Sequence, residues 1–217
     1  MSDKQIKAVL FDLDGTLTDT EKYYQIAWPK AFAHFGYKAE DYMPLELRSL
    51  GRPFAPRRLQ EWFGEDFDYN EVREYRKKLV EELIAENGIP LKPGAKEILE
   101  ALRERGILTA LVTANNYPRA SRYLKKIDLF DDFDKIICAN MVSQGKPAPD
   151  IYAYACRELS LQPHETFAVE DSPNGVTSAY LAGFNVIMIP DLTEPDEELS
   201  AKIYKRLDSL MDILDLL

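Results

Sequence analysis

Two carboxylates, Asp12 and Asp14, follow an apolar run near the start of the chain, and Gly15 comes directly after them. Burying an unpaired carboxylate is costly, so acids at the end of a buried strand normally bind a cation or take part in a reaction. Gly15 permits a tight turn that exposes backbone N–H groups to an anion. The spacing therefore predicts a functional site.

Further polar groups follow other β-like runs. Thr113 begins a Thr-Ala-Asn-Asn segment, Lys146 lies in a Gly-Lys-Pro-Ala-Pro-Asp segment, and Glu170 is followed by Asp171. The carboxyl ends of parallel strands share one edge of a sheet, where open α/β folds place their ligands. We therefore expect these groups to converge on the first acidic pair.

Such a set of side chains favours phosphoryl chemistry. Clustered carboxylates repel one another unless a cation lies between them, and hard oxygen ligands suit Mg²⁺. One carboxylate can attack phosphorus to form an aspartyl phosphate, and an acid two residues further along can protonate the leaving oxygen and later activate water. A hydroxyl group and a lysine can bind the phosphoryl oxygens.

The elements that must position these groups alternate along the chain. Almost continuous apolar runs are typical of strands buried on both faces of a parallel sheet, and helical patterns lie between them. This alternation predicts a doubly wound, Rossmann-like α/β core with right-handed crossovers. The predicted strands are 7–12, 109–113, 135–139, 166–170 and 185–189. One predicted helix is opened by the Pro-Gly-Ala segment at 93–95 and stopped at Gly106, and the others are 118–126, 149–159 and 173–182.

One segment, residues 20–90, interrupts the alternation. It has no β-like run, but it has apolar residues at helical spacing, for example at Val72, Tyr75, Leu79 and Leu83. We predict a helical cap domain over 20–90 and a core domain over 1–19 and 91–217. An insert that leaves the sheet beside the first acidic pair is placed to act as a lid.

Composition excludes several classes of function. The 217 residues carry a formal net charge of −10, whereas binding to nucleic acid needs a basic face. No apolar stretch resembles a signal peptide or is long enough to span a bilayer, so we expect a cytoplasmic protein with no membrane partner. The two cysteines, Cys138 and Cys156, are expected to be buried free thiols, and we expect a monomer.

Four motifs in order resemble those of the haloacid dehalogenase (HAD) superfamily of phosphohydrolases. They are the Asp-Leu-Asp-Gly-Thr segment at 12–16, Thr113, Lys146 and the Glu170-Asp171 pair, and they extend over nearly the whole chain. The Gly-Lys-Pro-Ala-Pro-Asp-Ile and Glu-Asp-Ser-x-x-Gly segments are most similar to those of the β-phosphoglucomutase-like branch. The insert resembles the superfamily's four-helix cap.

The resemblance implies a role for each acid. Asp12 is expected to be the nucleophile and a Mg²⁺ ligand. Asp14 is expected to be the general acid and base, with its backbone carbonyl on the metal. Asp171 is expected to bind the metal directly, and Glu170 either directly or through water.

The resemblance also implies contacts to the substrate. Thr113 is expected to donate a hydrogen bond to the transferring phosphoryl group, and Lys146 to bridge that group and the nucleophile. The remaining predicted substrate contacts are Tyr24, Arg52, Ala114 and Asn115.

These roles predict a Mg²⁺-dependent phosphatase that acts on a small phosphorylated metabolite, such as a sugar phosphate. A β-phosphoglucomutase-like phosphomutase is the alternative, although Tyr24 stands where the resemblance expects the mutase's hinge histidine. A non-catalytic phosphate-binding domain is a further alternative. Such a domain would be expected to lack Asp12, Asp14 or Lys146, all of which are present.

Overall fold

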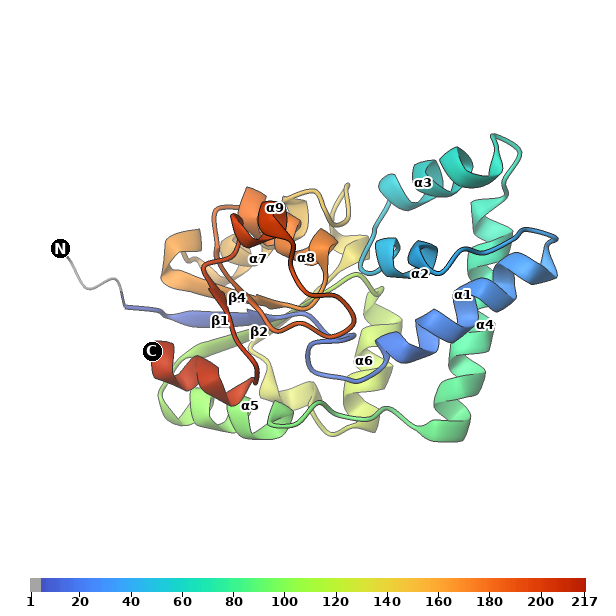
Figure 1. The fold of residues 1–217 in the computed structure, drawn as a ribbon. Helices are drawn as coiled ribbons and strands as arrows, with labels where there is room; N and C mark the ends of the chain where they lie inside the picture. The colour runs from blue at the N-terminus through green and yellow to red at the C-terminus, as the bar shows by residue number, and fades with distance from the viewer. Residues whose placement is uncertain (1–4) are drawn as a thin grey trace.

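The computed structural model describes residues 5–217, so the first four residues of the predicted core domain lie outside the described residues. Six parallel strands form one sheet in the order β3-β2-β1-β4-β5-β6 (Figure 1). The strands are β1 Ala8–Phe11, β2 Leu108–Thr113, β3 Lys135–Cys138, β4 Thr166–Glu170, β5 Asn185–Met188 and β6 Lys205–Arg206. The five predicted strands are confirmed. The sequence did not reveal β6, because its two residues are charged and exposed.

The strand order reverses at β1, which lies between β2 and β4. Phe11 at the end of β1 is in register with Leu111 on one side and Val169 on the other. A ligand crevice forms where the order of parallel strands reverses, outside their carboxyl ends. Asp12, the first residue beyond β1, therefore lies at this crevice.

Helices cover both faces of the sheet, which confirms the predicted doubly wound α/β core. Side chains of a strand alternate between its faces, so Val9 packs into one apolar cluster and Leu10 into the other. The first cluster includes residues of α5 (Ala95–Glu104) and α6 (Tyr117–Lys126), and the second includes residues of α7 (Asp150–Leu159) and α8 (Pro173–Leu181). The short elements are α9 Glu197–Ser200, η1 Phe130–Asp132, η2 Ala139–Met141, η3 Pro163–Glu165 and η4 Met211–Leu216.

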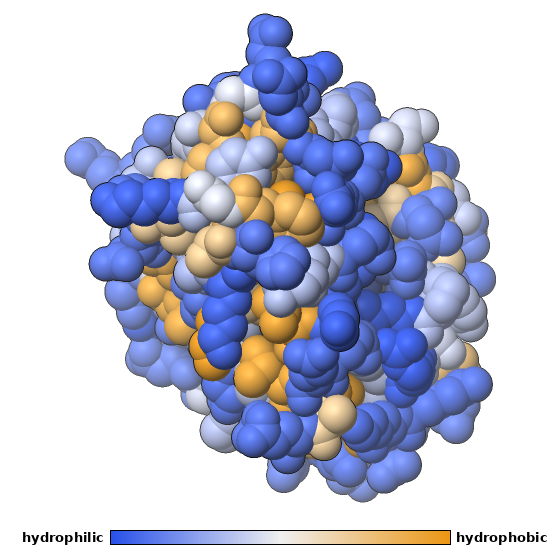
Figure 2. All heavy atoms as spheres, turned by 90° about the vertical axis from the view of Figure 1, so that its right-hand side faces the viewer, coloured by the Kyte–Doolittle hydropathy of each residue, from blue (hydrophilic) through white to orange (hydrophobic). Residues whose placement is uncertain are grey.

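The inserted segment follows β1 and is helical in the structure. Its helices are α1 Glu21–His34, α2 Tyr42–Glu46, α3 Phe54–Phe63 and α4 Tyr69–Asn87. Trp28, Phe32 and Leu59 belong to a third apolar cluster that this segment forms by itself. Figure 2 shows the face of the molecule on the side of these helices, where a band of hydrophobic side chains is bordered by hydrophilic ones. The division into a cap domain over 20–90 and a core domain over 1–19 and 91–217 stays a prediction.

Two details of the core agree with local sequence signals. The side chain of Asn116 accepts a hydrogen bond from the backbone N–H of Arg119 at 3.1 Å, so α6 begins at Tyr117, one residue before its predicted start. Cys138 and Cys156 are free and buried, as predicted. Among residues 5–217, no helix combines the length and the apolar character needed to cross a membrane.

Candidate active site

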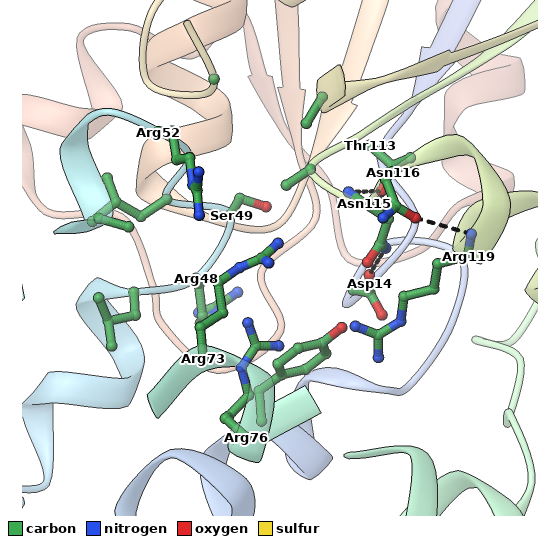
Figure 3. A pocket seen from close by; sticks show the side chains of 18 of the residues that line it. Asp14, Arg48, Ser49, Arg52, Arg73, Arg76, Thr113, Asn115, Asn116 and Arg119 are labelled. Atoms are coloured by element: carbon green, nitrogen blue, oxygen red, sulfur yellow. Dashed lines mark hydrogen bonds between the residues drawn. The ribbon is translucent and has the colours of Figure 1, made fainter. Parts of the chain in front are cut away.

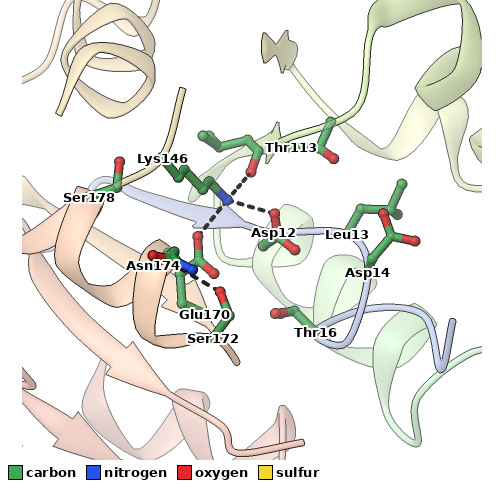
Figure 4. Close-up of polar contacts among 12 residues, drawn as sticks. Asp12, Leu13, Asp14, Thr16, Thr113, Lys146, Glu170, Ser172, Asn174 and Ser178 are labelled. Carbon is green, nitrogen blue, oxygen red and sulfur yellow. Dashed lines mark hydrogen bonds and ion pairs between the residues drawn. The ribbon is translucent and has the colours of Figure 1, made fainter. Parts of the chain in front are cut away.

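Lys146 lies at the centre of a buried network beside Asp12, at the end of β1 (Figure 4). Its Nζ donates hydrogen bonds to Asp12 Oδ1 at 2.6 Å, to Glu170 Oε1 at 2.6 Å and to the Val112 carbonyl at 3.0 Å. Burial acts to lower the pKa of Lys146, but the two carboxylates raise it above its usual value. The lysine therefore stays charged and holds the ends of β1 and β4 together through their acids.

Asp12, Glu170 and Asp171 bring their carboxylates together beside this lysine. One oxygen of each lies within 4.8 Å of the others. Burial raises the pKa of Asp12 well above its usual value; Lys146 opposes this shift, whereas Glu170 and Asp171 add to it. Lys146 pairs with Asp12 and Glu170, and an arginine of the insert pairs with Asp171, so the three carboxylates exceed the cations that contact them by one.

This group of acids fits a small divalent cation. All three offer hard oxygen ligands, which Mg²⁺ prefers. Glu170 Oε2 is buried without a hydrogen-bond partner among the described residues. Two glycines leave room for the acids, because a Cβ at Gly15 would overlap Asp171 Oδ2 and a Cβ at Gly175 would overlap Glu170 Oε2.

Arg48 reaches into this group from the inserted segment. Its Nη2 forms an ion pair with Asp171 Oδ2 and donates to the Asp171 carbonyl at 2.9 Å, while its Nη1 donates to Thr193 Oγ1 at 2.9 Å. Burial raises the pKa of Asp171 to about 6, and Arg48 opposes that rise. The insert therefore contributes a fully buried positive charge to the acidic end of the core.

Asp14 is held apart from the lysine network. Its Oδ1 accepts a hydrogen bond from Thr20 Oγ1 at 2.5 Å, and its Oδ2 accepts one from Asn115 Nδ2 at 2.6 Å. Thr20 directly precedes α1, where the insert leaves the core. The position of the Asp14 carboxyl group thus depends on the loop after β2 and on the junction with the insert.

A cavity of about 490 Å³ separates the core from the insert (Figure 3). Asp12 and Asp14 line its core side, whereas Lys146, Glu170 and Asp171 are buried behind Asp12. The structure therefore brings the predicted acids and Lys146 together at one end of the cavity. The other predicted residues that line it are Tyr24, Arg52, Thr113, Ala114 and Asn115.

Most of the positive charge around this cavity was not predicted from the sequence. Five arginines line it, namely Arg48, Arg52, Arg73, Arg76 and Arg119, and only Arg52 was predicted as a contact. A signal for Arg76 existed, because it lies at helical spacing between Val72 and Val80 on the buried face of α4. The prediction for this helix considered apolar residues only. It therefore selected Tyr75, Leu79 and Leu83, which are only partly buried, and not Arg76.

The fold and this site define a class of protein, and comparison with known proteins names it. Residues 6–183 match the family of haloacid dehalogenase-like hydrolases, and the chain belongs to that family. It is therefore an enzyme of the phosphoric monoester hydrolase class, which agrees with the predicted enzyme class.

Three similar proteins illustrate the range of this family. A phosphorylated carbohydrates phosphatase of Thermotoga maritima is 30% identical, with 84% of each chain covered. A β-phosphoglucomutase of Bacillus subtilis is 27% identical, with 82% of this chain and 80% of the mutase covered. The crystal structure of a CbbY variant from Rhodobacter sphaeroides, in complex with xylulose-(1,5)bisphosphate, superposes with a TM-score of 0.78 at 29% identity and covers 95% of both chains.

Proposed function

We propose that this protein is a Mg²⁺-dependent phosphatase that hydrolyses a small sugar phosphate through an aspartyl phosphate on Asp12. The main observation in support is the convergence of Asp12, Glu170 and Asp171 beside Lys146 at one end of the cavity between the core and the insert. The phosphatase of Thermotoga maritima and the bisphosphate complex of CbbY support a phosphorylated carbohydrate as the substrate class.

In the first step, Asp12 acts as the nucleophile. Lys146 binds its Oδ1, and among the described residues Oδ2 accepts no hydrogen bond. Oδ2 attacks phosphorus, the bond from phosphorus to the sugar oxygen breaks, and Asp14 gives its proton to that leaving oxygen. The products of this step are an aspartyl phosphate and a free sugar hydroxyl group.

In the second step, Asp14 takes a proton from water and the resulting hydroxide attacks phosphorus. The bond between phosphorus and Asp12 Oδ2 breaks, which releases inorganic phosphate and restores the carboxylate. Hydrogen bonds from Thr20 and Asn115 keep the Asp14 carboxyl group at one place through both proton transfers. Asp14 thus serves both as the acid and as the base.

Thr113 is suited to binding the phosphoryl group during these steps. Its Oγ1 accepts hydrogen bonds at 3.1 Å from the backbone N–H and from the side-chain amide of Asn115, so its own proton is available to a phosphoryl oxygen. A Mg²⁺ ion held by Asp12, Glu170 and Asp171 would supply positive charge against the phosphoryl group. The predicted ligation by the Asp14 carbonyl belongs to this proposal.

We also propose that residues 20–90 act as a cap over the reaction. Two backbone hydrogen bonds join the insert to the core beside Lys146, from Gly51 N to the Lys146 carbonyl at 2.8 Å and from Gly145 N to the Arg52 carbonyl at 2.7 Å. A cap closed in this way excludes bulk water from the aspartyl phosphate until the sugar has left.

The nucleophile is tested by replacing Asp12 with Asn. Phosphate release from p-nitrophenyl phosphate and from sugar phosphates should fall by about 10³-fold or more, because the amide cannot form the phosphoenzyme. The circular dichroism spectrum should be unchanged. Asp131→Asn, at an exposed site, is the matched control and should keep full activity. Normal turnover by the Asp12 variant would falsify the assignment.

The metal is tested without relying on turnover alone. Chelation should abolish phosphate release, and Mg²⁺ should restore it. Mg²⁺ should also raise the melting temperature of the wild type, because a ligand that binds only the folded state stabilises it. This shift should vanish in Asp171→Asn. An equal shift in that variant would remove Asp171 from the proposed metal site.

The similarity to a β-phosphoglucomutase favours one second candidate, transfer of the phosphoryl group to another sugar. Incubation with β-glucose 1-phosphate and its bisphosphate activator separates the two reactions. A phosphatase releases inorganic phosphate. Formation of glucose 6-phosphate without inorganic phosphate would establish the mutase reaction instead.

A further inference from the structure

The cavity carries strong positive charge in an acidic protein. Arg48 is neutralised by Asp171, and Arg52 donates to Asn70 Oδ1 at 2.5 Å and lies over the Tyr69 ring. Arg76 and Arg119 are different. Each has a buried guanidinium nitrogen without a partner among the described residues, as Arg48 has, but neither forms an ion pair with a buried carboxylate there. In Figure 3 their guanidinium groups point toward each other from opposite sides of the cavity.

Arg76 has no carboxylate partner among the described residues. Its side chain extends from α4 with only 7% of the residue exposed, and its guanidinium lies 5.0 Å from the ring centre of Tyr24 and 4.7 Å from that of Trp28. The buried Nε has no hydrogen-bond acceptor in the described part of the chain. Burial lowers the pKa of Arg76, and the nearby cations Arg119 and Arg73 lower it further. The contacts with the two aromatic rings offset part of the cost of burying this charge, but no carboxylate among the described residues neutralises it.

Arg119 approaches the same place from the core. Its guanidinium lies 5.6 Å from the centre of the Tyr24 ring, and its Nε donates to Tyr123 Oη at 2.8 Å. Its distance to Glu81 Oε1 is 3.5 Å, but Nη2 is buried and has no partner among residues 5–217. The two arginines thus flank Tyr24, each with hydrogen-bonding capacity left over.

Two guanidinium groups with unused hydrogen-bond donors favour the binding of an anion between them. Like charges in a poorly solvated cavity repel each other, and each has lost part of its hydration. A phosphate or carboxylate group between them would accept charge-assisted hydrogen bonds in the forked geometry that arginine provides. The transferring phosphoryl group cannot supply this anion at the same time, because it must lie at Asp12.

We propose that the substrate carries a second anionic group, a phosphate or a carboxylate, which Arg76 and Arg119 bind above Tyr24. The inference rests on the proposed phosphatase function and adds the substrate class. A cavity of about 490 Å³ accommodates a compact sugar-sized molecule with an anion at each end. The second anion then holds the substrate against both the insert and the core, so its binding favours the closed arrangement.

Matched pairs of substrates test this selectivity. We would compare kcat/KM for fructose 1,6-bisphosphate with fructose 1-phosphate, and for 3-phosphoglycerate with glycerol 3-phosphate. In the wild type, at least one doubly anionic member should exceed its partner by about tenfold or more, as expected for a charge-assisted contact. The first pair reports on a second phosphate and the second pair on a carboxylate.

Substitutions of the two arginines then test whether these residues bind the second anionic group. Arg76→Met and Arg119→Met should each reduce the preference for the doubly anionic substrate by about 10- to 100-fold, mainly through KM. Hydrolysis of p-nitrophenyl phosphate, which has no second anion, should change much less. Arg76→Lys should keep part of the preference. The matched control is Lys126→Met, which removes an exposed cation from the same helix as Arg119, and it should leave the preference unchanged.

Ionic strength provides a second measurement should a methionine variant fold poorly. Added salt should lower the wild-type preference, because it screens the second anion. Equal kcat/KM within both pairs would overturn the inference, and so would an equal loss on all substrates in Arg76→Met. If the wild type released no phosphate from any compound, including p-nitrophenyl phosphate, the phosphatase proposal itself would fail.

Discussion

The two sides of the cavity use buried charge in opposite ways. On the core side, Lys146 is satisfied by Asp12, Glu170 and a backbone carbonyl, and Tyr152 donates to the same Glu170 oxygen at 2.5 Å. On the opposite side, Arg76 rests on aromatic rings with no acid to pair with among the described residues. Lys146 therefore has its counter-charges within the core, whereas Arg76 has none among the described residues.

This difference indicates that the core side and the insert side of the cavity have different functions. The acids that pair with Lys146 lie at the ends of the central strands β1 and β4, which are hydrogen-bonded on both sides. The side that holds Arg76 is built mainly from α1 and α4, which contribute residues to the apolar cluster of the insert. We infer that the core determines the reaction and the insert selects the substrate, so substitutions on the two sides should have different consequences.

The largest effect is expected for Lys146→Met. Removal of the lysine leaves Asp12 and Glu170 buried without their cation, which should lower the free energy of unfolding by about 3–5 kcal/mol and abolish phosphate release. Urea denaturation measures the first quantity. Lys126→Met, at an exposed site on α6, is the control. Similar stability of the two variants would show that the lysine network contributes little to the core.

A smaller loss is expected for Gly175→Ala in α8. Alanine normally stabilises a helix relative to glycine, but a Cβ here overlaps the carboxylate of Glu170. We expect a loss of about 1–3 kcal/mol from this overpacking, together with weaker binding of Mg²⁺. The control is Thr177→Ala in the same helix. Any gain in stability at Gly175 would mean that Glu170 has room to move away.

Arg52→Ala should weaken substrate binding without changing the stability of the protein or the rate of the reaction step. The side chain is exposed and its contacts with Asn70 and Tyr69 lie at the cavity rim, so the free energy of unfolding should change by less than about 0.5 kcal/mol. KM for the substrate should rise by about two- to fivefold with kcat unchanged, as for an exposed ionic contact. Steady-state kinetics measures both. A fall in kcat alone would place Arg52 with the reacting groups instead.

The smallest effect is expected from thiol reagents, which test the packing of the core. Burial raises the pKa of Cys138 to about 12, and burial and Glu165 raise that of Cys156 to about 11. At pH 8 roughly one thiol in a thousand or fewer is the reactive thiolate, so alkylation of the folded protein should be slow and activity unchanged. Both cysteines should react once guanidinium unfolds the chain. Rapid labelling of the native protein would indicate that the core opens readily.

Much of the reaction site was predictable because its signals are local. Asp12 and Asp14 follow a short apolar run that is typical of a buried strand, and the turn after it contains Gly15, whose φ is +91°. The ends of parallel strands must meet at one edge, so placing Thr113, Lys146 and Glu170 required no knowledge of side-chain packing.

The sequence alone therefore determined the doubly wound core and the set of groups that its strand ends bring together, because hydrophobic periodicity and parallel topology decide both. Only the tertiary structure showed that Arg48 pairs with Asp171 and that Arg76 and Arg119 meet at Tyr24. These residues are far apart in the sequence, and a charged residue on a helix is usually solvated. Their meeting depends on how the insert packs on the core, and no local pattern encodes that packing.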